Sequence, residues 1–247
     1  MNCTQCKTRN CFVQQYCSVD WVNEISQSKN QVKYKRGQYI FHEGDRVFGL
    51  YFIQQGKVKI ISTGFSSKEQ IVRLATEGHI VGHRGFGSET YPIGAVALED
   101  TVACFVDNAV LYNAFMKNPK LTYALMMFYS FELRRTEIRQ RYLAQMSIRE
   151  KVVDTLIYLK EIFGILQKEK SLNVTLSRQE LADISGTTSE QVTRVLTELE
   201  NEKLIKKSGK KILLLNAEGL NKIITAHHKD IHATTWSVYE KEMMSVH

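Results

Sequence analysis

The sequence predicts an α+β protein. An N-terminal antiparallel β-roll, a long helix and a C-terminal winged helix-turn-helix follow one another along the chain. Three observations lead to this prediction. Ten of the fourteen glycines lie between Gly37 and Gly94, among short β-rich runs. The segment from Leu121 to Met146 contains neither glycine nor proline. Further on, two short amphipathic helical patterns flank Gly186 and precede a lysine-rich hairpin pattern.

The length and charge of the chain limit its number of domains and the kinds of partner that it can bind. The 247 residues are enough for about two domains. No apolar run approaches the roughly 18 residues that a membrane span needs, and the first residues lack the basic and apolar parts of a secretory signal. We therefore expect a cytoplasmic protein with no membrane partner. The formal net charge of +7 suits a polyanionic partner.

The first half of the chain is predicted to form short strands. Turn signals recur every 8–12 residues, which is typical of an antiparallel barrel or jelly roll. The strand-like runs are 39–41, 50–53, 58–61, 71–74 and 102–106. We assign residues 19–118 to this β-roll domain, after a cysteine-rich N-terminal segment at 1–18.

Two helices are predicted next. Pro119 suits a first helical turn, and the helix that follows is roughly 40 Å long at 1.5 Å per residue. A helix of that length exceeds what one small domain covers, so residues 119–147 are interpreted as a connector with a dimer seam. A second helix is expected at 148–163, ending before Gly164.

The most informative stretch is Thr188–Leu199. Val192, Val195, Leu196 and Leu199 have the spacing of one buried helix face. The outward candidates are polar: Ser189, Glu190, Thr193, Arg194 and Thr197. Such groups hydrogen-bond base edges in a major groove. The simpler alternatives are that Glu190 is only the N3 acid of a capping box and that Arg194 is a solvated charge.

Local signals frame this helix. Ser177 and Glu180 have capping-box spacing and open a preceding short helix, Gly186 breaks it, and Thr187 with Glu190 offers a second capping box. A hairpin with a Ser208–Gly209 turn is expected to follow, carrying Lys206, Lys207, Lys210 and Lys211. These lysines would contact phosphates of double-stranded DNA. The winged domain is placed at 148–220, and the tail at 221–247 is expected to hold a final helix without an assigned function.

Two motifs resemble a known family. Arg36–Asp45 and Leu50–Lys59 are similar to the KGxxxFxxGD…LYxIxxGxxK pattern of the CRP/FNR family of bacterial transcription regulators, with Arg36 in place of lysine. The resemblance extends over about residues 18–220. It implies a cyclic-nucleotide-binding-like β-roll, a homodimer that binds DNA, RNA polymerase as a partner if the protein is an activator, and no enzymatic activity.

The cyclic-AMP branch of the family matches poorly. Its members carry a Gly-Glu pair and an Arg-Ser/Thr pair for the cyclic nucleotide. Here Gly82-His83 and Gly85-Phe86 lack the glutamate, and Ile93-Gly94 occupies the place of the arginine pair. A cyclic phosphate would lose its bidentate clamp, so we do not expect cAMP to bind.

The FNR branch is more similar. Cys3, Cys6, Cys11 and Cys17 crowd the N-terminus, and Cys104 lies in a segment that resembles the one holding the distant cluster ligand of that branch. The resemblance implies a [4Fe–4S] cluster on Cys3, Cys6, Cys11 and Cys104. Only four residues separate Cys6 from Cys11, whereas FNR sensors have five, so Cys17 is an alternative ligand. Zinc binding, or free cysteines with Cys104 in the core, are the other interpretations.

The same resemblance assigns further roles. The dimer seam would run through Met126, Tyr129, Leu133, Thr136, Gln140 and Leu143. Its polar middle would weaken the dimer, although a constitutive dimer bonded across the seam is the competing interpretation. Arg194 would donate to guanine, Glu190 would accept from cytosine and Thr193 would touch a thymine methyl, on a palindrome with TTGA-type half-sites.

Two other functions compete with an iron–sulfur regulator. One is a regulator of the same family with another small effector or with none. The other is a cyclic-nucleotide-binding regulatory subunit of an enzyme or channel, which would leave the winged helix unexplained. The sequence shows no catalytic constellation.

Overall fold

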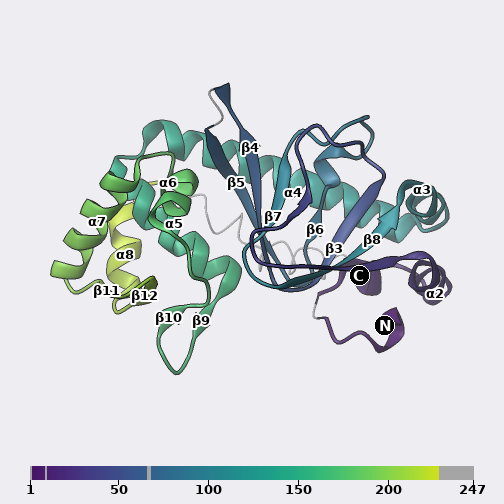
Figure 1. The fold of residues 1–247 in the computed structure, drawn as a ribbon, viewed down its shortest axis with the longest axis horizontal. Helices are drawn as coiled ribbons and strands as arrows, with labels where there is room; N and C mark the ends of the chain where they lie inside the picture. Colours follow the sequence, from purple (N-terminus) through teal and green to yellow (C-terminus); the bar gives the residue numbers. More distant parts are fainter. Residues whose placement is uncertain (1, 9, 66–67, 228–247) are drawn as a thin grey trace. The chain divides into compact units, whose positions relative to one another are not determined.

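The computed structural model describes residues 2–8, 10–65 and 68–227. The chain divides into two compact units, residues 1–126 and 127–247, and the division falls inside the long helix. The α+β class is confirmed (Figure 1). None of the described helices is long and apolar enough to cross a membrane.

The first unit contains the β-roll. Its described strands form two four-stranded antiparallel sheets with the orders β1-β8-β3-β6 and β2-β7-β4-β5. The strands are β1 (Asn30–Tyr34), β2 (Tyr39–Phe41), β3 (Gly49–Gln55), β4 (Lys57–Thr63), β5 (Glu69–Thr76), β6 (Ile80–Val81), β7 (Gly94–Ala97) and β8 (Thr101–Asp107). All five predicted runs are strands. The strands β1, β6 and β7 were not predicted, because β1 is polar and exposed and the other two are only two and four residues long.

Aromatic side chains fill part of the β-roll interior. The rings of Phe41 and Tyr91 stack with centroids 4.1 Å apart, and the Tyr91 hydroxyl donates to the carbonyl of Gly49 at 2.7 Å. Gly49 itself is required by close packing, since a Cβ there would meet the Val106 carbonyl oxygen at 2.1 Å. The Tyr91 bond ties the segment before β7 to the start of β3, and the absence of a side chain at Gly49 lets β3 pair closely with β8.

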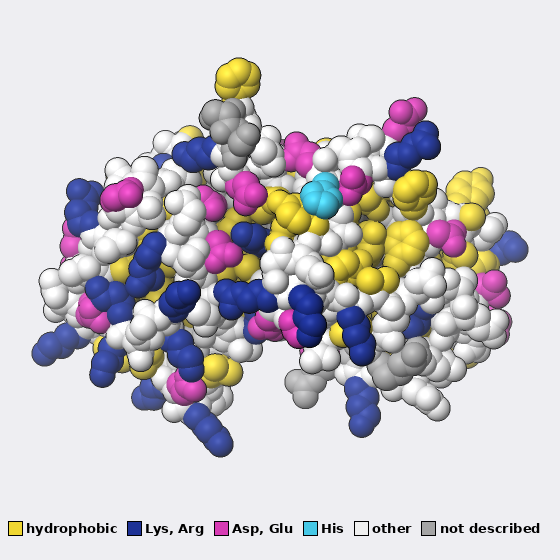
Figure 2. Space-filling model, viewed as in Figure 1, with side chains coloured by type: hydrophobic (Ala, Val, Ile, Leu, Met, Phe, Trp, Pro, Cys, Tyr) yellow, Lys and Arg dark blue, Asp and Glu magenta, His cyan; other side chains and the backbone are white. Residues whose placement is uncertain are grey.

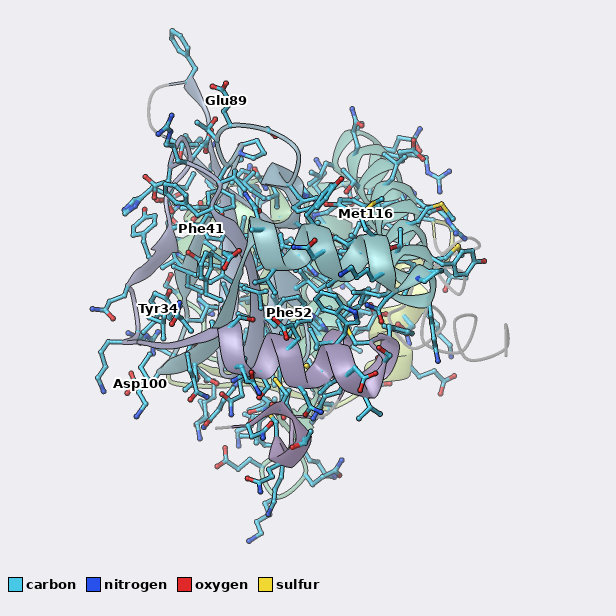
Figure 3. The ribbon with its side chains drawn as sticks, turned by 90° about the vertical axis from the view of Figure 1, so that its right-hand side faces the viewer. Tyr34, Phe41, Phe52, Glu89, Asp100 and Met116 are labelled. Carbon is cyan, nitrogen blue, oxygen red and sulfur yellow. The ribbon has the colours of Figure 1, made fainter. Side chains whose placement is uncertain are left out.

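Short helices flank the β-roll. They are η1 (Cys3–Gln5), α1 (Phe12–Tyr16), α2 (Val19–Ser28), η3 (His83–Gly85) and α3 (Asn108–Lys117). Figure 3 shows α2 and α3 side by side on one flank of the strands, with Met116 on α3 and Phe52, from β3, between the two helices in this view. Phe52 is buried, and Met116 is exposed. The N-terminal segment is therefore packed onto the β-roll: the backbone N–H of Cys3 bonds Ser26 on α2, and the Thr8 hydroxyl bonds a carbonyl on β3.

The helices of the second half match the predicted ranges closely. Helix α4 covers Pro119–Gln145 and α5 covers Ile148–Phe163, where a capping box of Ser147 and Glu150 begins the helix. The helix-turn-helix is α6 (Arg178–Ser185) and α7 (Ser189–Asn201), and α8 (Ala217–Ile224) follows the wing. The tail prediction for 228–247 lies outside the described residues.

The wing belongs to a third sheet with the strand order β11-β12-β10-β9. Its strands are β9 (Ile165–Leu166), β10 (Ser171–Leu172), β11 (Ile205–Ser208) and β12 (Lys211–Leu214). Ser208 pairs with Lys211, so the two turn residues are Gly209 and Lys210, one position later than predicted. Gly209 takes a φ of 59°, which suits a two-residue hairpin turn.

Candidate functional site

Helix α7, the second helix of the helix-turn-helix, presents its polar face as predicted. Val192, Val195, Leu196 and Leu199 are at most 2% exposed. The opposite face borders an open groove lined by Arg178, Ser189, Glu190, Thr193, Arg194, Thr197, Glu198 and Asn201. All five predicted readers on the helix lie in this groove. Arg178, Glu198 and Asn201 were missed, although Glu198 stands one helical turn after Arg194.

The turn before α7 differs by one residue from the prediction. The capping box at Ser177 and Glu180 is present, and Gly186 ends α6 in the left-handed conformation at a φ of 64°. The second cap is Thr188, whose side chain accepts from the backbone N–H of Gln191. The predicted box of Thr187 with Glu190 is therefore wrong. Glu190 is therefore not the N3 residue of a capping box, and its side chain lines the exposed groove.

Nearby hydrogen bonds lower the pKa of the Glu190 carboxyl. The pKa is lowered first by the residue's own backbone N–H and then by the hydroxyls of Thr188 and Ser189. The Thr193 and Thr197 hydroxyls donate to carbonyls one turn earlier, at 2.8 and 2.9 Å. Their methyl groups are thereby left for apolar contact, which is the contact that a thymine methyl offers.

The four wing lysines are not equivalent. The Lys207 ammonium lies 3.0 Å from the Thr197 hydroxyl and 3.0 Å from the Glu200 carboxylate, so it braces the wing against α7. The Lys211 ammonium lies 2.7 Å from Glu169. Lys206 and Lys210 are exposed and make no ion pair within the described part of the chain. In Figure 2, lysine and arginine side chains gather over α7 and the wing.

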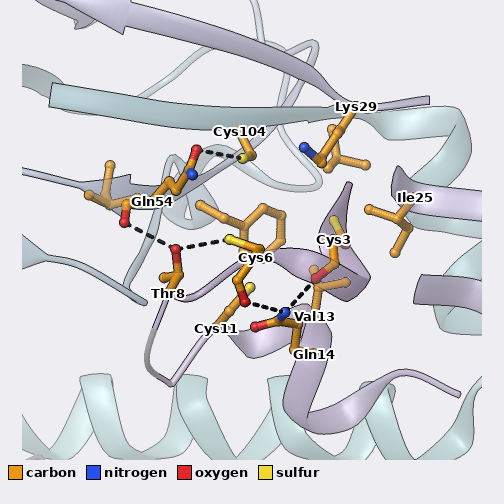
Figure 4. A pocket seen from close by; sticks show the side chains of 13 residues that line it. Cys3, Cys6, Thr8, Cys11, Val13, Gln14, Ile25, Lys29, Gln54 and Cys104 are labelled. Atoms are coloured by element: carbon orange, nitrogen blue, oxygen red, sulfur yellow. Dashed lines mark hydrogen bonds between the residues drawn. The ribbon is translucent and has the colours of Figure 1, made fainter. Parts of the chain in front are cut away.

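One pocket in the first unit is lined by four of the five cysteines. Cys3, Cys6, Cys11 and Cys104 line this pocket, together with Thr8, Gln14, Lys29 and Gln54 (Figure 4). Cys17 is not among the lining residues. The distant Cys104 is brought there by β8, which pairs with β3 and places Cys104 opposite Phe52. The predicted ligand set therefore lines one pocket, whereas the alternative cysteine lies beside it, near enough for the charges of Cys11 and Cys3 to raise its pKa.

Side-chain amides connect the parts of this pocket. The Gln14 amide donates to the carbonyls of Cys3 and Cys6 at 2.5 and 3.1 Å, which ties the η1 turn to the helix that follows Cys11. Thr8 joins the Cys6 sulfur, at 3.1 Å, to the Gln54 carbonyl. The Cys104 thiol lies 4.0 Å from the Gln54 side-chain oxygen. None of these polar partners was singled out from the sequence, because their roles depend on contacts between distant segments.

The pocket environment is mostly apolar. Burial raises the pKa of the Cys11 thiol to about 11, and it raises the pKa of Cys104 as well, against the opposing charge of Lys29. Beside the pocket, burial raises the pKa of the Cys17 thiol to about 12. The cavity has a volume of about 30 Å³, room for one or two water molecules. Among the described residues, no three His, Cys, Asp or Glu side chains stand at metal-ligand spacing. The donor set suits a thiolate-bound group, but the thiols are not in coordination geometry.

The predicted seam residues of α4 are placed unevenly. Met126 and Leu133 are 57% and 62% exposed, although both are large apolar side chains. Thr136 and Gln140 are exposed, and the Thr136 hydroxyl donates within its own helix to the Glu132 carbonyl at 2.8 Å. Leu143 instead lies close to Gly186, at the end of α6. The exposed apolar side chains of the predicted seam, Met126 and Leu133, thus lie in its first half.

Comparisons with known proteins give a family match for each half of the chain. A model of the cyclic nucleotide-binding domain matches residues 31–118, and a model of the Crp-like helix-turn-helix domain matches residues 150–223. The chain is 28% identical over 183 residues to the transcriptional activator protein Anr of Pseudomonas protegens, covering 74% of this chain and 75% of that protein.

Two further similarities span more of the chain. It is 25% identical over 219 residues to the fumarate and nitrate reduction regulatory protein of Vibrio cholerae, covering 84% of this chain and 86% of the relative. The solved structure of FixK2 from Bradyrhizobium japonicum superposes with a TM-score of 0.72 at 22% identity, over 78% of this chain and 96% of that one. The structural likeness supports the fold.

Proposed function

The chain belongs to the CRP/FNR family of DNA-binding transcription regulators, a family without enzymatic activity, and from that premise we propose an iron–sulfur sensor of the FNR type. In this proposal a dimer binds palindromic DNA, and a [4Fe–4S] cluster reports a redox or oxygen-type signal. The observation that carries the proposal is the single pocket lined by Cys3, Cys6, Cys11 and Cys104.

The donor chemistry supports the cluster. Four cysteine thiolates are the usual ligands of a cubane cluster, and the bound group supplies redox chemistry that responds to oxidants. The protein's part is to present the thiols. The Gln14 amide holds the backbone of Cys3 and Cys6, and the β3–β8 pairing holds Cys104 against the same space. Cys17, outside the pocket, is assigned no ligand role.

The DNA-binding half follows from the groove on α7. Arg194 donates to guanine, Glu190 accepts from cytosine and the Thr193 methyl contacts thymine, on double-stranded DNA with TTGA-type half-sites. Lys206 and Lys210 supply phosphate contacts from the wing. Such a regulator acts in the cytoplasm, and RNA polymerase is its further partner if it activates transcription.

Dimerisation links the two halves in this proposal. The exposed Met126 and Leu133 are seven residues apart on α4, the spacing of a coiled-coil seam. The polar Thr136 and Gln140 continue the seam and make it weak. A marginal dimer responds to a modest bias from a bound cluster, because a ligand shifts an equilibrium by its differential affinity for the two states.

A second candidate keeps the DNA-binding role without a cluster. The observation that favours it is the small cavity, whose thiols are not at metal-ligand spacing in the described residues. In that case another small effector, or none, controls the regulator.

One preparation separates the two candidates. The protein is purified without oxygen and divided, and one half is exposed to air. Iron and sulfide per chain, sedimentation and affinity for a palindromic TTGA-type duplex are measured on both halves. The cluster proposal predicts about four irons per chain, a dimer and tight binding before air, with all three lost afterwards. Anaerobic protein that lacks iron but binds the duplex equally well in both halves supports the second candidate.

A further inference from the structure

We propose that Glu198 determines DNA specificity by positioning Arg194, and that Arg149 holds Glu198 in place. The proposal rests on the base-reading role assigned to Arg194 above and concerns residues of the second unit only.

Glu198 stands beside the reader on the DNA-facing surface. It lies one helical turn after Arg194 on α7, and its Oε1 is 3.8 Å from the Arg194 Nε. Both side chains line the groove that also contains Glu190 and Thr193. A carboxylate in this place is unexpected for a surface that approaches phosphates, because it repels them. Its position therefore calls for a role other than affinity.

Arg149 fixes the other side of that carboxylate. It comes from α5, and its Nη1 lies 3.3 Å from the Glu198 Oε2. Its Nη2 donates to both oxygens of Glu202, at 2.7 and 2.8 Å. The Arg149 side chain is 31% exposed, against 66% for Arg194. A guanidinium bound to two carboxylates is restricted in orientation, so Arg149 holds Oε2 of Glu198 and leaves Oε1 directed to Arg194.

This arrangement affects the choice that Arg194 makes on DNA. A flexible guanidinium can bind any nearby phosphate or the edge of a guanine, and only the second contact carries sequence information. Glu198 draws the guanidinium along the helix and repels the phosphates. Phosphate capture is therefore disfavoured relative to the base contact. Discrimination of this kind comes from contacts that penalise the wrong complex as well as those that favour the right one.

The chain offers a matched control for this idea. Glu198→Gln and Glu202→Gln each remove one negative charge near the C-terminal end of α7, and each leaves an amide oxygen that can still accept from Arg149, but only the first removes the carboxylate partner of Arg194. The affinity of the full-length protein is measured on three duplexes: the palindrome, the palindrome with its guanine positions replaced, and a scrambled sequence.

The expected result is a loss of discrimination in one variant. Glu198→Gln should reduce the palindrome-to-scrambled affinity ratio about tenfold, or ~1.4 kcal/mol, and relax the preference at the guanine position. Glu202→Gln should stay within about twofold of the parent. Arg149→Gln should act like Glu198→Gln. The double variant Arg149→Gln/Glu198→Gln should lose no more than either single variant, because both substitutions interrupt the same series of contacts to Arg194.

Two outcomes overturn the inference at different points. If Arg194→Ala retains the guanine preference, the reader assignment fails and the positioning role fails with it. If Arg194→Ala loses that preference but Glu198→Gln keeps it, or if Glu198→Gln and Glu202→Gln behave alike, the base reader stands and only the positioning role is wrong. Thermal unfolding of each variant confirms that the proteins compared are folded.

Discussion

The recognition helix and the cysteine pocket are built in opposite ways. Helix α7 takes its apolar stripe and its polar face from thirteen consecutive residues, and its cap from Thr188 directly before them. The pocket takes Cys3, Cys6 and Cys11 from the N-terminus and Cys104 from a strand about a hundred residues away. The polar surface of α7 is thus a local property of the sequence, whereas the cysteine pocket exists only when the β-roll has folded. Substitutions in the cysteine pocket should therefore leave the surface of α7 intact, and substitutions on α7 should leave the pocket intact.

The largest expected effect concerns the ligand set. Cys104→Ser removes the thiol that the β-roll supplies, so anaerobic iron should fall from about four per chain to well below one. Cys17→Ser is the matched control, because Cys17 lies outside the pocket, and it should keep the parent's iron content. Iron and sulfide analysis of both variants tests this prediction. Equal iron loss in both variants would return Cys17 to the ligand set.

A smaller effect is expected at the base reader. Arg194→Ala should weaken binding by about 1–3 kcal/mol, mainly on duplexes that keep the guanine. The iron content should not change, since α7 and the cysteines are in different units. Titration of paired duplexes that differ only at the guanine tests this. A uniform loss on every sequence would make Arg194 a phosphate contact.

The wing should contribute less and without sequence preference. In Lys206→Ala/Lys210→Ala, the slope of log affinity against log salt should shrink by about one per lost phosphate contact. Lys211→Ala serves as the control, because its ammonium already pairs with Glu169. Binding measured over a salt series gives both slopes. An unchanged slope in the double variant would place the wing away from the DNA.

The smallest effect tests the turn before α7. Thr188→Ala removes the cap on the Gln191 backbone N–H and should cost about 1 kcal/mol of unfolding free energy. Thr187→Ala should cost less, since the Thr187 hydroxyl bonds the Gln191 side chain instead of a helix N–H. Denaturant unfolding measures both. A larger loss at Thr187 would restore the cap predicted from the sequence.

The same contrast explains what the sequence could predict. Helices α4 to α7, five strands and the polar face of α7 follow local periodicity and capping, so their ranges were predicted closely. The errors of one residue, at Thr188 and in the Gly209–Lys210 turn, come from neighbouring residues that are equally suited to the same turn.

Other features needed the folded chain. Local pattern cannot show that Lys207 braces α7, that Leu143 lies near Gly186, or that Arg149 reaches two glutamates about fifty residues away. The gathering of Cys104 with the N-terminal cysteines came from family resemblance. The pocket gives that resemblance a physical basis, because the β3–β8 register carries Cys104 to it.

In our proposal the cysteine site controls assembly of the dimer and does not affect base reading. The decisive measurement compares the anaerobic parent and Cys104→Ser on a full palindrome and on a single half-site. The variant should lose the parent's affinity advantage for the palindrome but match the parent on the half-site. Equal palindrome affinity for the two proteins, or an equal loss on both duplexes, would contradict it.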